Sequence, residues 1–467
     1  MFTTLPILFL LALGLLHRAA GTGVDSGFVT TSQGQFFLDS RTFRHYGTNA
    51  YWLNMVTDED LDFTFLSIAG AGYTVVRTWA FNDVSQKPAS GTYFQILQGG
   101  TATINDGPDG LQRLDKVVAT ANKYGLKLVL TLTNNWNPQH AQSSSSIARL
   151  RRDNSALPRG FLSNDYGGMD LYVSNFHPGG THDLFYTDST IITAFKKYTA
   201  TIVNRYLNDS TILGWELAND PRCSSTVPAS SSCNTKTITK WVALMSSYIK
   251  SLDSCHLVTA GDSGFYCLGC PKIYAPSSVL PQASSLRTGP AFDGSYGVDT
   301  QDIISVPTID FGSFQFFPDQ VQTYASKTPN FAIDSLGHGI TWVSDHSDTG
   351  GSVGKPETLT AYGIVTKQSW DNFVPVNGTA PTSGGLSTGS GGVEVFQRDF
   401  GTISWSSIGL NGNIGGILEY QWAGNELTGT SSKRQTAHPP PNDGYANYAG
   451  PNSQAVANLM GTSNTPS

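Results

Sequence analysis

Apolar runs of strand length alternate with longer runs of helical periodicity along almost the whole sequence. The clearest pair is 111–125, where Leu, Val and Ala recur at helical spacing, and 126–136, a nearly continuous apolar run. Strand candidates of this kind lie at 45–52, 73–81, 126–136, 211–219, 256–264, 308–318, 354–363 and 413–422. Helical runs lie between several of them, at 58–71, 111–125, 189–207 and 237–253. Buried parallel strands separated by helices indicate an α/β fold, and eight such units predict a (β/α)8 TIM barrel.

One barrel accounts for most of the chain, since barrels of this kind run long as single domains. We expect the domain to cover 22–450. Two polar, partly Gly/Ser-rich segments, 137–168 and 377–396, interrupt the alternation and are predicted to be inserted loops on the C-terminal face of the barrel. Residues 451–467 are predicted to be a loose C-terminal tail.

The N-terminus has the pattern of a secretory signal peptide. Residues 1–21 contain an apolar run of roughly 14 residues followed by small residues, which is too short for a membrane span. The sequence therefore predicts a secreted, extracellular protein that has no membrane association after cleavage. The sequons at Asn208 and Asn377 are candidate glycosylation sites in such a protein.

Five cysteines lie close together in the chain, and in a secreted protein they are disulfide candidates first. Cys223 and Cys233 would close a short loop, and Cys267 and Cys270 a very short one, which leaves Cys255 over. The Cys-x-x-Cys pair has no second pair and no histidine cluster beside it, so we expect no metal. No motif calls for a cofactor.

The low content of charged residues and the negative net charge argue against nucleic acid as a partner. Only 13% of residues are charged and the formal net charge is −7, so the chain offers no basic stripe for nucleic acid. A surface rich in hydroxyl groups suits a neutral glycan. We expect a monomer.

Polar residues follow several of the predicted strands. Arg77, Asn135, Asn219, Asp220 and Gln315 all lie at or near strand C-termini. The chemistry of a (β/α)8 barrel is carried by that end of the strands. The sequence therefore places a candidate site there.

Several stretches together resemble fungal endo-β-1,4-mannanases of glycoside hydrolase family 5, across nearly the whole mature chain. They are "FRHYGTNAYWL" (43–53), "VVRTWAFNDV" (75–84), "LTNNW" (132–136), "YGGMDLYV" (166–173), "WELANDPRC" (215–223), "FPDQ" (317–320), "WVSDH" (342–346), "GKPETLTAYGIVT" (354–366) and "NDGYANY" (442–448). The resemblance implies a (β/α)8 barrel, secretion and a cleft for β-mannan. It also implies retaining hydrolysis by two Glu residues whose carboxyl groups are about 5 to 5.5 Å apart.

Both catalytic positions of the family are substituted here. The acid/base Glu falls on Asp220, whose shorter side chain misplaces the carboxyl group, an effect that can cost about 100-fold. The nucleophile falls on Ala361, and losing such a group typically costs about 10⁴ to 10⁶ in turnover. We expect Glu357 to lie about 13 Å lower, on the face of Ala361. Glu419 is the other candidate replacement.

Other positions of the family's site have changed as well. The resemblance aligns a His-x-Tyr of the family with Gln315 and Phe317, and a sugar-stacking Trp with Tyr420. Ser263 stands where relatives often carry Glu. The resemblance gives sugar contact to a set whose members could alternatively be scaffold: Arg77, Asn135, Trp136, Asn219, Gln315, Phe317 and Tyr420. We expect Glu216 to be structural.

Three functions follow from these residues. The first is a mannanase-family protein that has lost most or all hydrolysis and keeps glycan binding. The second is a glycoside hydrolase of altered mechanism that uses Asp220 with Glu419, Asp165 or Asp170. The third is a structural or interaction protein with a vestigial cleft.

Overall fold

We describe the fold from a computed structural model of the chain. The structure describes residues 27–136, 159–276 (without 161), 278–318 (without 280, 283–286 and 288), 331–369 (without 368), 393–422 and 444–445. The predicted signal peptide, the predicted tail, Asn377 and much of the two inserted segments lie outside these residues.

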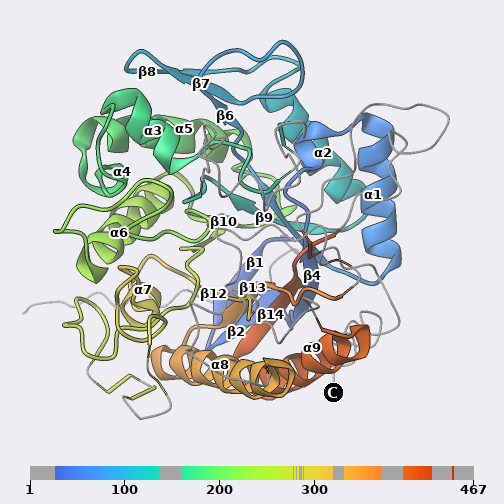
Figure 1. The fold of residues 1–467 in the computed structure, drawn as a ribbon. Helices are drawn as coiled ribbons and strands as arrows, with labels where there is room; N and C mark the ends of the chain where they lie inside the picture. Colours follow the sequence, from blue (N-terminus) through green and yellow to red (C-terminus); the bar gives the residue numbers. More distant parts are fainter. Residues whose placement is uncertain are drawn as a thin grey trace, which may run out of the picture.

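Eight parallel strands form the central barrel, as predicted (Figure 1). They follow one another around the barrel in chain order, and the last strand pairs with the first. The gap between the fifth and sixth strands is bridged by hydrogen bonds from Asp310 N to Val258 O (2.8 Å) and from Gln315 N to Ser263 O (3.2 Å). The strands are β4 (His45–Asn49), β5 (Val75–Trp79), β9 (Lys127–Thr131), β10 (Ile212–Glu216), β11 (Leu257–Thr259), β12 (Gly312–Phe316), β13 (Glu357–Tyr362) and β14 (Ile414–Glu419).

Helices surround the strands (Figure 1). Side-chain caps begin several of them: Asp188 accepts from the backbone N–H groups of residues 190 and 191, and Asn234 caps the next long helix with Thr237. The helices are α1 (Asp58–Gly70), α2 (Leu111–Lys123), α3 (Met169–Phe176), α4 (Leu184–Thr187), α5 (Ser189–Arg205), α6 (Thr235–Leu252), α7 (Thr300–Ile304), α8 (Phe331–Val353), α9 (Val395–Leu410) and the 3₁₀ helix η1 (Leu53–Met55). Helix α9 begins inside the segment 377–396, which we had expected to be loop throughout.

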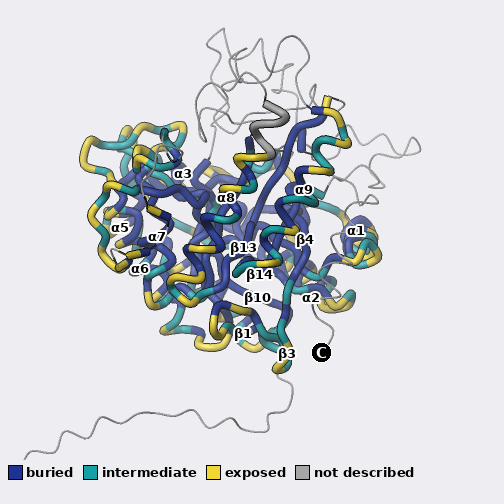
Figure 2. The backbone as a smooth tube through the Cα atoms, turned by 90° about the horizontal axis from the view of Figure 1, so that it is seen from below, coloured by how far each residue is buried: buried dark blue, intermediate teal, exposed yellow. Residues whose placement is uncertain are grey.

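An N-terminal hairpin packs against the inside of the barrel. It consists of β1 (Val29–Ser32), β2 (Gln35–Leu38) and β3 (Arg41–Thr42). Phe36 of the hairpin and Phe43 join one apolar cluster with inward-facing residues of the barrel strands: Val75, Val129, Leu213, Leu257 and Leu418. The buried residues run through the centre of the molecule in Figure 2. This hairpin was not predicted from the sequence.

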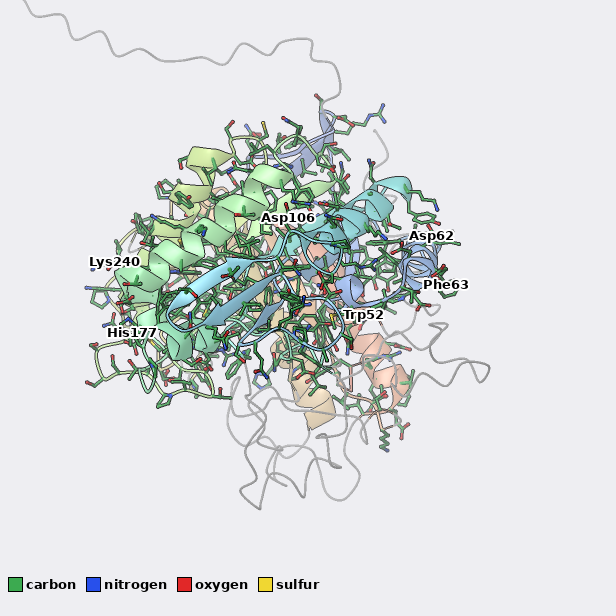
Figure 3. All side chains as sticks on the ribbon, turned by 90° about the horizontal axis from the view of Figure 1, so that it is seen from above. Trp52, Asp62, Phe63, Asp106, His177 and Lys240 are labelled. Atoms are coloured by element: carbon green, nitrogen blue, oxygen red, sulfur yellow. A yellow bond between two sulfur atoms is a disulfide. The ribbon has the colours of Figure 1, made fainter. Side chains whose placement is uncertain are left out.

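A second small sheet follows β5. It contains β6 (Asp83–Val84), β7 (Gln95–Gln98) and β8 (Thr101–Ile104), and it was not predicted either. Figure 3 shows charged side chains such as Asp62 and Lys240 at the periphery, whereas Trp52 lies toward the middle. Trp52 is buried, and its indole N–H lies 3.3 Å from the carbonyl oxygen of Trp422.

The predicted disulfides are present in the structure. Cys223 is bonded to Cys233 and Cys267 to Cys270, while Cys255 is exposed and has a free thiol. Asn208, the sequon residue inside the described chain, is exposed. Within the described ranges, none of the helices combines the length and the hydrophobicity needed to cross a membrane.

Candidate functional site at the barrel mouth

We call the C-terminal end of the barrel strands the mouth. Arg77 forms its floor, and the guanidinium group of Arg77 is hydrogen-bonded to other side chains of the protein. Its Nε lies 3.1 and 2.9 Å from the two carboxylate oxygens of Glu216, and Nη2 lies 2.5 Å from Oε1 of Glu216. Nη1 donates to Asn49 and Nη2 to Asn219, at 2.9 and 2.8 Å. Thr131 adds a hydrogen bond of 2.9 Å to Glu216. Since Arg77 is only 1% exposed, its clearest role is to position these neighbours, and sugar contact by Arg77 stays a prediction.

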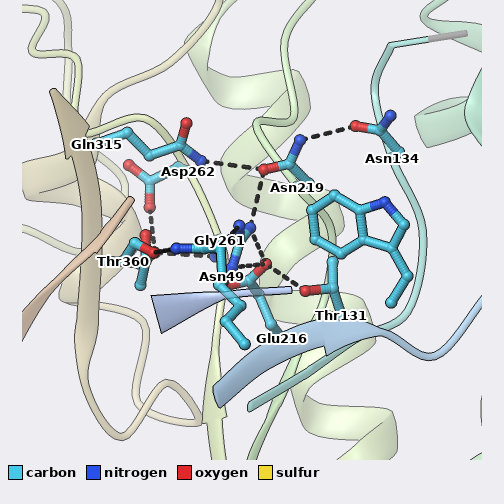
Figure 4. A network of polar contacts seen from close by, with 12 residues as sticks. Asn49, Thr131, Asn134, Glu216, Asn219, Gly261, Asp262, Gln315 and Thr360 are labelled. Atoms are coloured by element: carbon cyan, nitrogen blue, oxygen red, sulfur yellow. Dashed lines mark hydrogen bonds and ion pairs between the residues drawn. The ribbon is translucent and has the colours of Figure 1, made fainter. Parts of the chain in front are cut away.

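Asn219 lies next to Arg77, between the side chains of Asn134 and Gln315 (Figure 4). Its Oδ1 accepts from both Arg77 and Nε2 of Gln315, the latter at 3.1 Å. Its Nδ2 donates to Oδ1 of Asn134 at 2.8 Å. Because the oxygen accepts and the nitrogen donates within the protein, the orientation of this amide is fixed. Asn219 is half-buried, so its remaining surface is available at the mouth.

The carboxylate of Asp220 is bonded on both oxygens. Oδ1 accepts from Ser263 Oγ at 2.6 Å and from Arg222 Nε at 2.8 Å, and Oδ2 accepts from Trp136 Nε1 at 2.7 Å. The residue is buried and has a φ of 54°, in the left-handed region that Asp tolerates better than most residues. A general acid must turn one carboxyl oxygen toward the glycosidic oxygen of the substrate. Here both oxygens of Asp220 accept hydrogen bonds from other side chains of the protein.

Arg222 lies among three aromatic rings. Its guanidinium carbon is 5.2 Å from the ring centroid of Trp136 and 4.7 Å from those of Phe265 and Tyr296. Contacts of this length are attractive because the faces of the rings carry negative potential. Sequence reasoning missed Arg222 as a site residue. The available signal was its position two residues after Asp220 in the strand-end motif.

The position expected to carry the nucleophile faces the mouth. Ala361 of β13 pairs with Gln315 of β12, and paired residues of parallel strands point to the same face. Gln315 reaches Asn219 on that face. Ala361 is buried. Its methyl group lies where the resemblance requires a carboxylate, and it has no lone pair with which to attack a sugar.

Aromatic side chains form the neighbouring part of the mouth. Phe317 lies edge-on to Tyr420 and Tyr445, with ring centroids 5.4 and 5.1 Å apart, and Tyr420 and Tyr445 are 5.8 Å apart. Tyr51 stacks on Tyr420 at 6.4 Å. Tyr445 was not predicted as a site residue, because it lies outside every strand candidate and only the folded chain brings it here.

Asn135 lies beside the mouth. Its Oδ1 is 2.8 Å from Nε2 of His182 and accepts from the backbone N–H of Arg222 at 3.1 Å. Its Nδ2 donates to Ser224 O at 3.2 Å, and the residue is fully buried. These contacts anchor the loop that carries Arg222. These contacts fit the scaffold alternative for Asn135, and sugar contact stays a prediction.

Glu419 points away from the mouth. Its carboxylate oxygens lie 2.6 Å from the hydroxyl of Tyr73 and 3.2 Å from that of Tyr362. The preceding residue, Leu418, packs into the barrel interior, and alternate residues of a strand face opposite sides. Tyr362 in turn packs edge-on against Trp405 of α9. Glu419 thus belongs to the interface between barrel and helices.

Three further carboxylates are also engaged elsewhere. Glu357 does not lie beneath Ala361 on the same face: a register shift in β13 intervenes, and Glu357 faces α8, 3.4 Å from Nδ1 of His346. Asp170 is fully buried and bonded to His182. Asp165 accepts from the backbone N–H of residue 162 in its own turn.

Comparison with known protein families gives one family-model match. Residues 26–267 match the model described as GH family 5 beta-mannosidase-like. Mannan endo-1,4-beta-mannosidase A of Aspergillus aculeatus is 34% identical over 405 residues, which is 85% of this chain and 87% of that protein. Mannan endo-1,4-beta-mannosidase A of Hypocrea jecorina is 34% identical over 369 residues, 77% of this chain and 68% of that protein.

Solved structures agree with this match. The endo-1,4-beta-mannanase of Rhizomucor miehei has a TM-score of 0.67 and 28% identity, over 93% of this chain and 99% of that chain. The hyperthermostable endo-1,4-beta-D-mannanase of Thermotoga petrophila has a TM-score of 0.62 and 26% identity, over 90% of this chain and 100% of that chain.

Proposed function

This chain belongs to the β-mannosidase-like group of glycoside hydrolase family 5, and we propose that it is a secreted protein that binds β-mannan-type polysaccharide without retaining hydrolysis. The observation that carries the proposal is Ala361. It occupies the mouth-facing position of β13 beside Gln315, where the resemblance expects the nucleophile.

Retaining hydrolysis needs two carboxyl groups about 5 to 5.5 Å apart, one to attack the anomeric carbon and one to protonate the leaving oxygen. At the mouth the candidate for the second role is Asp220, which is bonded to Ser263, Arg222 and Trp136. Without a nucleophile, the remaining carboxylate serves as an anchor for these donors.

Glycan binding is supported by the groups that are still accessible. Asn219, Arg222 and Phe317 are half-buried and combine an amide, a guanidinium group and an aromatic ring. Sugars are held by this kind of combination, since hydrogen bonds fix the hydroxyl groups and rings cover the apolar face of the pyranose. Relatives named mannan endo-1,4-beta-mannosidase and endo-1,4-beta-mannanase suggest β-mannan as the polysaccharide.

The altered-mechanism hypothesis would need a second carboxylate at the mouth. Glu419, its main candidate, is held by Tyr73 and Tyr362 on the helix side of β14. Asp170 is fully buried behind the mouth. We therefore place this hypothesis second.

The test measures hydrolysis and binding on the same protein. We expect the purified protein to release no more reducing sugar from galactomannan than the Asp220→Ala variant, while its migration through a galactomannan gel is retarded. Phe317→Ala should abolish the retardation, and Lys367→Ala, at an exposed ion pair with Glu394, should keep it. Release above the Asp220→Ala level would refute the loss of hydrolysis. Absence of retardation would refute glycan binding and favour the vestigial cleft.

A further inference from the structure

A buried carboxylate holds the loop that follows β10. We call residues 222–230 the Arg222 loop. Oδ2 of Asp170 in α3 accepts hydrogen bonds from the hydroxyl groups of Ser225 and Thr226 in this loop, the second at 2.9 Å. Asp170 is fully buried. The position of the loop, and with it that of Arg222, therefore depends on the contacts of Asp170.

His182, which lies between α3 and α4, connects this carboxylate to the end of the barrel. Its Nδ1 lies 2.5 Å from Oδ1 of Asp170, and its Nε2 lies 2.8 Å from Oδ1 of Asn135, which follows β9. Neither side chain of the Asp170–His182 pair is exposed. Each ring nitrogen of His182 therefore faces one oxygen atom at hydrogen-bond distance, away from solvent.

The amide oxygen of Asn135 can only accept from His182. This oxygen accepts from the backbone N–H of Arg222 at 3.1 Å, and Nδ2 of Asn135 donates to the backbone carbonyl of Ser224 at 3.2 Å. A backbone N–H always donates and a backbone carbonyl always accepts, so the two contacts exclude the flipped orientation of the amide. Since the amide oxygen carries no hydrogen, Nε2 of His182 must carry one.

The contact between His182 and Asp170 requires a second hydrogen. Without it, a lone pair of Nδ1 would face a lone pair of the carboxylate at 2.5 Å. The two side chains together therefore hold two hydrogens, as an imidazolium beside a carboxylate or as the equivalent neutral pair. An ionised Asp beside a neutral His, which is the ordinary combination above about pH 6.5, holds only one hydrogen and would leave one of the two contacts without any.

Further charged and titratable groups lie around the ring of His182, and they belong to three parts of the chain: Asp183 beside it, Tyr186 of α4, and Asp220 and Arg222 after β10. Asp183 accepts from the backbone N–H and the hydroxyl of Ser230 in the Arg222 loop, both at 2.7 Å. Asp220 and Arg222 pair with each other at 2.8 Å. The carboxylate that contacts the ring itself is that of Asp170, so the charge at the ring is shared within this pair.

We propose that His182 is a positioning residue for glycan binding: with two hydrogens in the Asp170–His182 pair, it fixes Asn135 and Asp170, and through them the Arg222 loop. The inference rests on the proposed function, in which Arg222 is one of the groups that contact the glycan. Loss of one hydrogen as the pH rises turns one attractive contact into repulsion between two lone pairs. Glycan binding should therefore be complete at low pH and weaken as the pair loses its second hydrogen.

The hydrogens can be counted without any glycan. In protein labelled with ¹⁵N-histidine, NMR spectra at about pH 5.5 should show one hydrogen on Nε2 of His182 and a second in the contact of Nδ1 with Asp170. His182→Gln identifies these signals by their absence. His45 and His346 provide the contrast, because burial lowers the pKa of each to about 3, so each should show one ring hydrogen. A single hydrogen in the Asp170–His182 pair would overturn the proposal, whatever the protein binds.

Binding to insoluble mannan, measured by co-sedimentation from about pH 5.5 to 9 at constant ionic strength, tests the positioning role. We expect wild-type binding to weaken in parallel with the loss of the second hydrogen. In Asp170→Asn the amide nitrogen can donate to Nδ1, while its oxygen accepts from Ser225 and Thr226, so a neutral His182 keeps both contacts. This variant should show no fall in binding with pH. His182→Leu lacks both contacts and should bind about tenfold more weakly throughout.

His177→Gln is the matched control. His177 follows α3 and lies at the periphery, 3.0 Å from Asp188 (Figure 3), so this variant should keep the wild-type pH profile. A fall in binding that persists in Asp170→Asn, or wild-type binding by His182→Leu, would overturn the positioning role alone. A wild-type protein that binds no mannan at any pH would overturn the proposed function and the positioning role together.

Discussion

The hydroxyl of Ser263 lies 2.6 Å from Oδ1 of Asp220, across the gap between the ends of β10 and β11. This contact joins two residues that the sequence analysis placed at substituted positions of the family's site. Asp220 is one methylene shorter than the Glu that the resemblance predicts at its position, and its carboxylate accepts a hydrogen bond from the hydroxyl of Ser263. The two side chains fit each other as donor and acceptor, and both are buried, so this part of the mouth is well packed and well bonded.

Restoring the acids should restore hydrolysis. We expect the variant with Ala361→Glu, Asp220→Glu and Phe317→Tyr to release reducing sugar from galactomannan at least about 100-fold faster than Asp220→Ala, since loss of the nucleophile typically costs about 10⁴ to 10⁶. Asp220→Glu alone should stay at the background level because it still lacks a nucleophile. Activity of Asp220→Glu alone would show that another residue attacks the sugar.

Arg77 should be essential for stability. Arg77→Ala leaves the buried carboxylate of Glu216 without its cation, and breaking a buried pair in this way costs about 3 to 5 kcal/mol. The free energy of unfolding in urea measures the loss. Lys367→Ala is the control, because the Lys367–Glu394 pair is largely exposed and surface pairs contribute little. Equal stability of the two variants would contradict the role given to Arg77.

His45 should make the protein sensitive to acid. Burial lowers the pKa of His45 to about 3, whereas the unfolded chain has a value near 6.5. The unfolded state therefore binds more protons between these values, and this contribution to stability is lost progressively as the pH falls below about 6.5. His45→Asn should reduce the slope of unfolding free energy against pH by up to about 1.4 kcal/mol per unit in this window. Urea titrations at a series of pH values would show an unchanged slope if the prediction is wrong.

The Cys223–Cys233 disulfide should stabilise the loop that carries Arg222. The bond spans 10 positions, and the entropy of closing a loop of this size predicts a loss of about 2 to 3 kcal/mol in the double Ser variant. Thermal unfolding of that variant, compared with Cys255→Ser, measures the effect. Cys255 is exposed and unbonded, so its variant should unfold at the wild-type temperature.

The barrel was predictable because each of its strands produces a local pattern of apolar residues in the sequence. The run 126–136 contains β9, and 111–125 contains α2, since buried apolar residues recur there with the period of each element. The hairpin β1–β3 was missed because its strands are only two to four residues long. Strands this short carry too few residues to show a period.

Some contacts among the predicted site residues follow from the strand pattern, and others do not. Ala361 and Gln315 were expected together, and the pairing of β12 with β13 brings them together. Asn135 was predicted to contact sugar or to be scaffold, and its anchoring of a loop depends on His182 and Arg222, which reach it from distant parts of the chain. Contacts of this kind depend on tertiary packing and leave no local pattern.

The pairing of β4 with β14, which closes the barrel, affects how the chain folds during synthesis. It joins the first barrel strand to the last, as in the contact between Thr48 and Glu419, 371 positions apart. During synthesis at ~5 to 20 residues per second, the emerging chain therefore spends tens of seconds as an unfinished sheet with two open edges. Open edges of this kind expose unpaired backbone N–H and C=O groups, which can pair with strands of other chains and cause aggregation. Expression yield should therefore depend strongly on chaperones during the interval before the last strand is made.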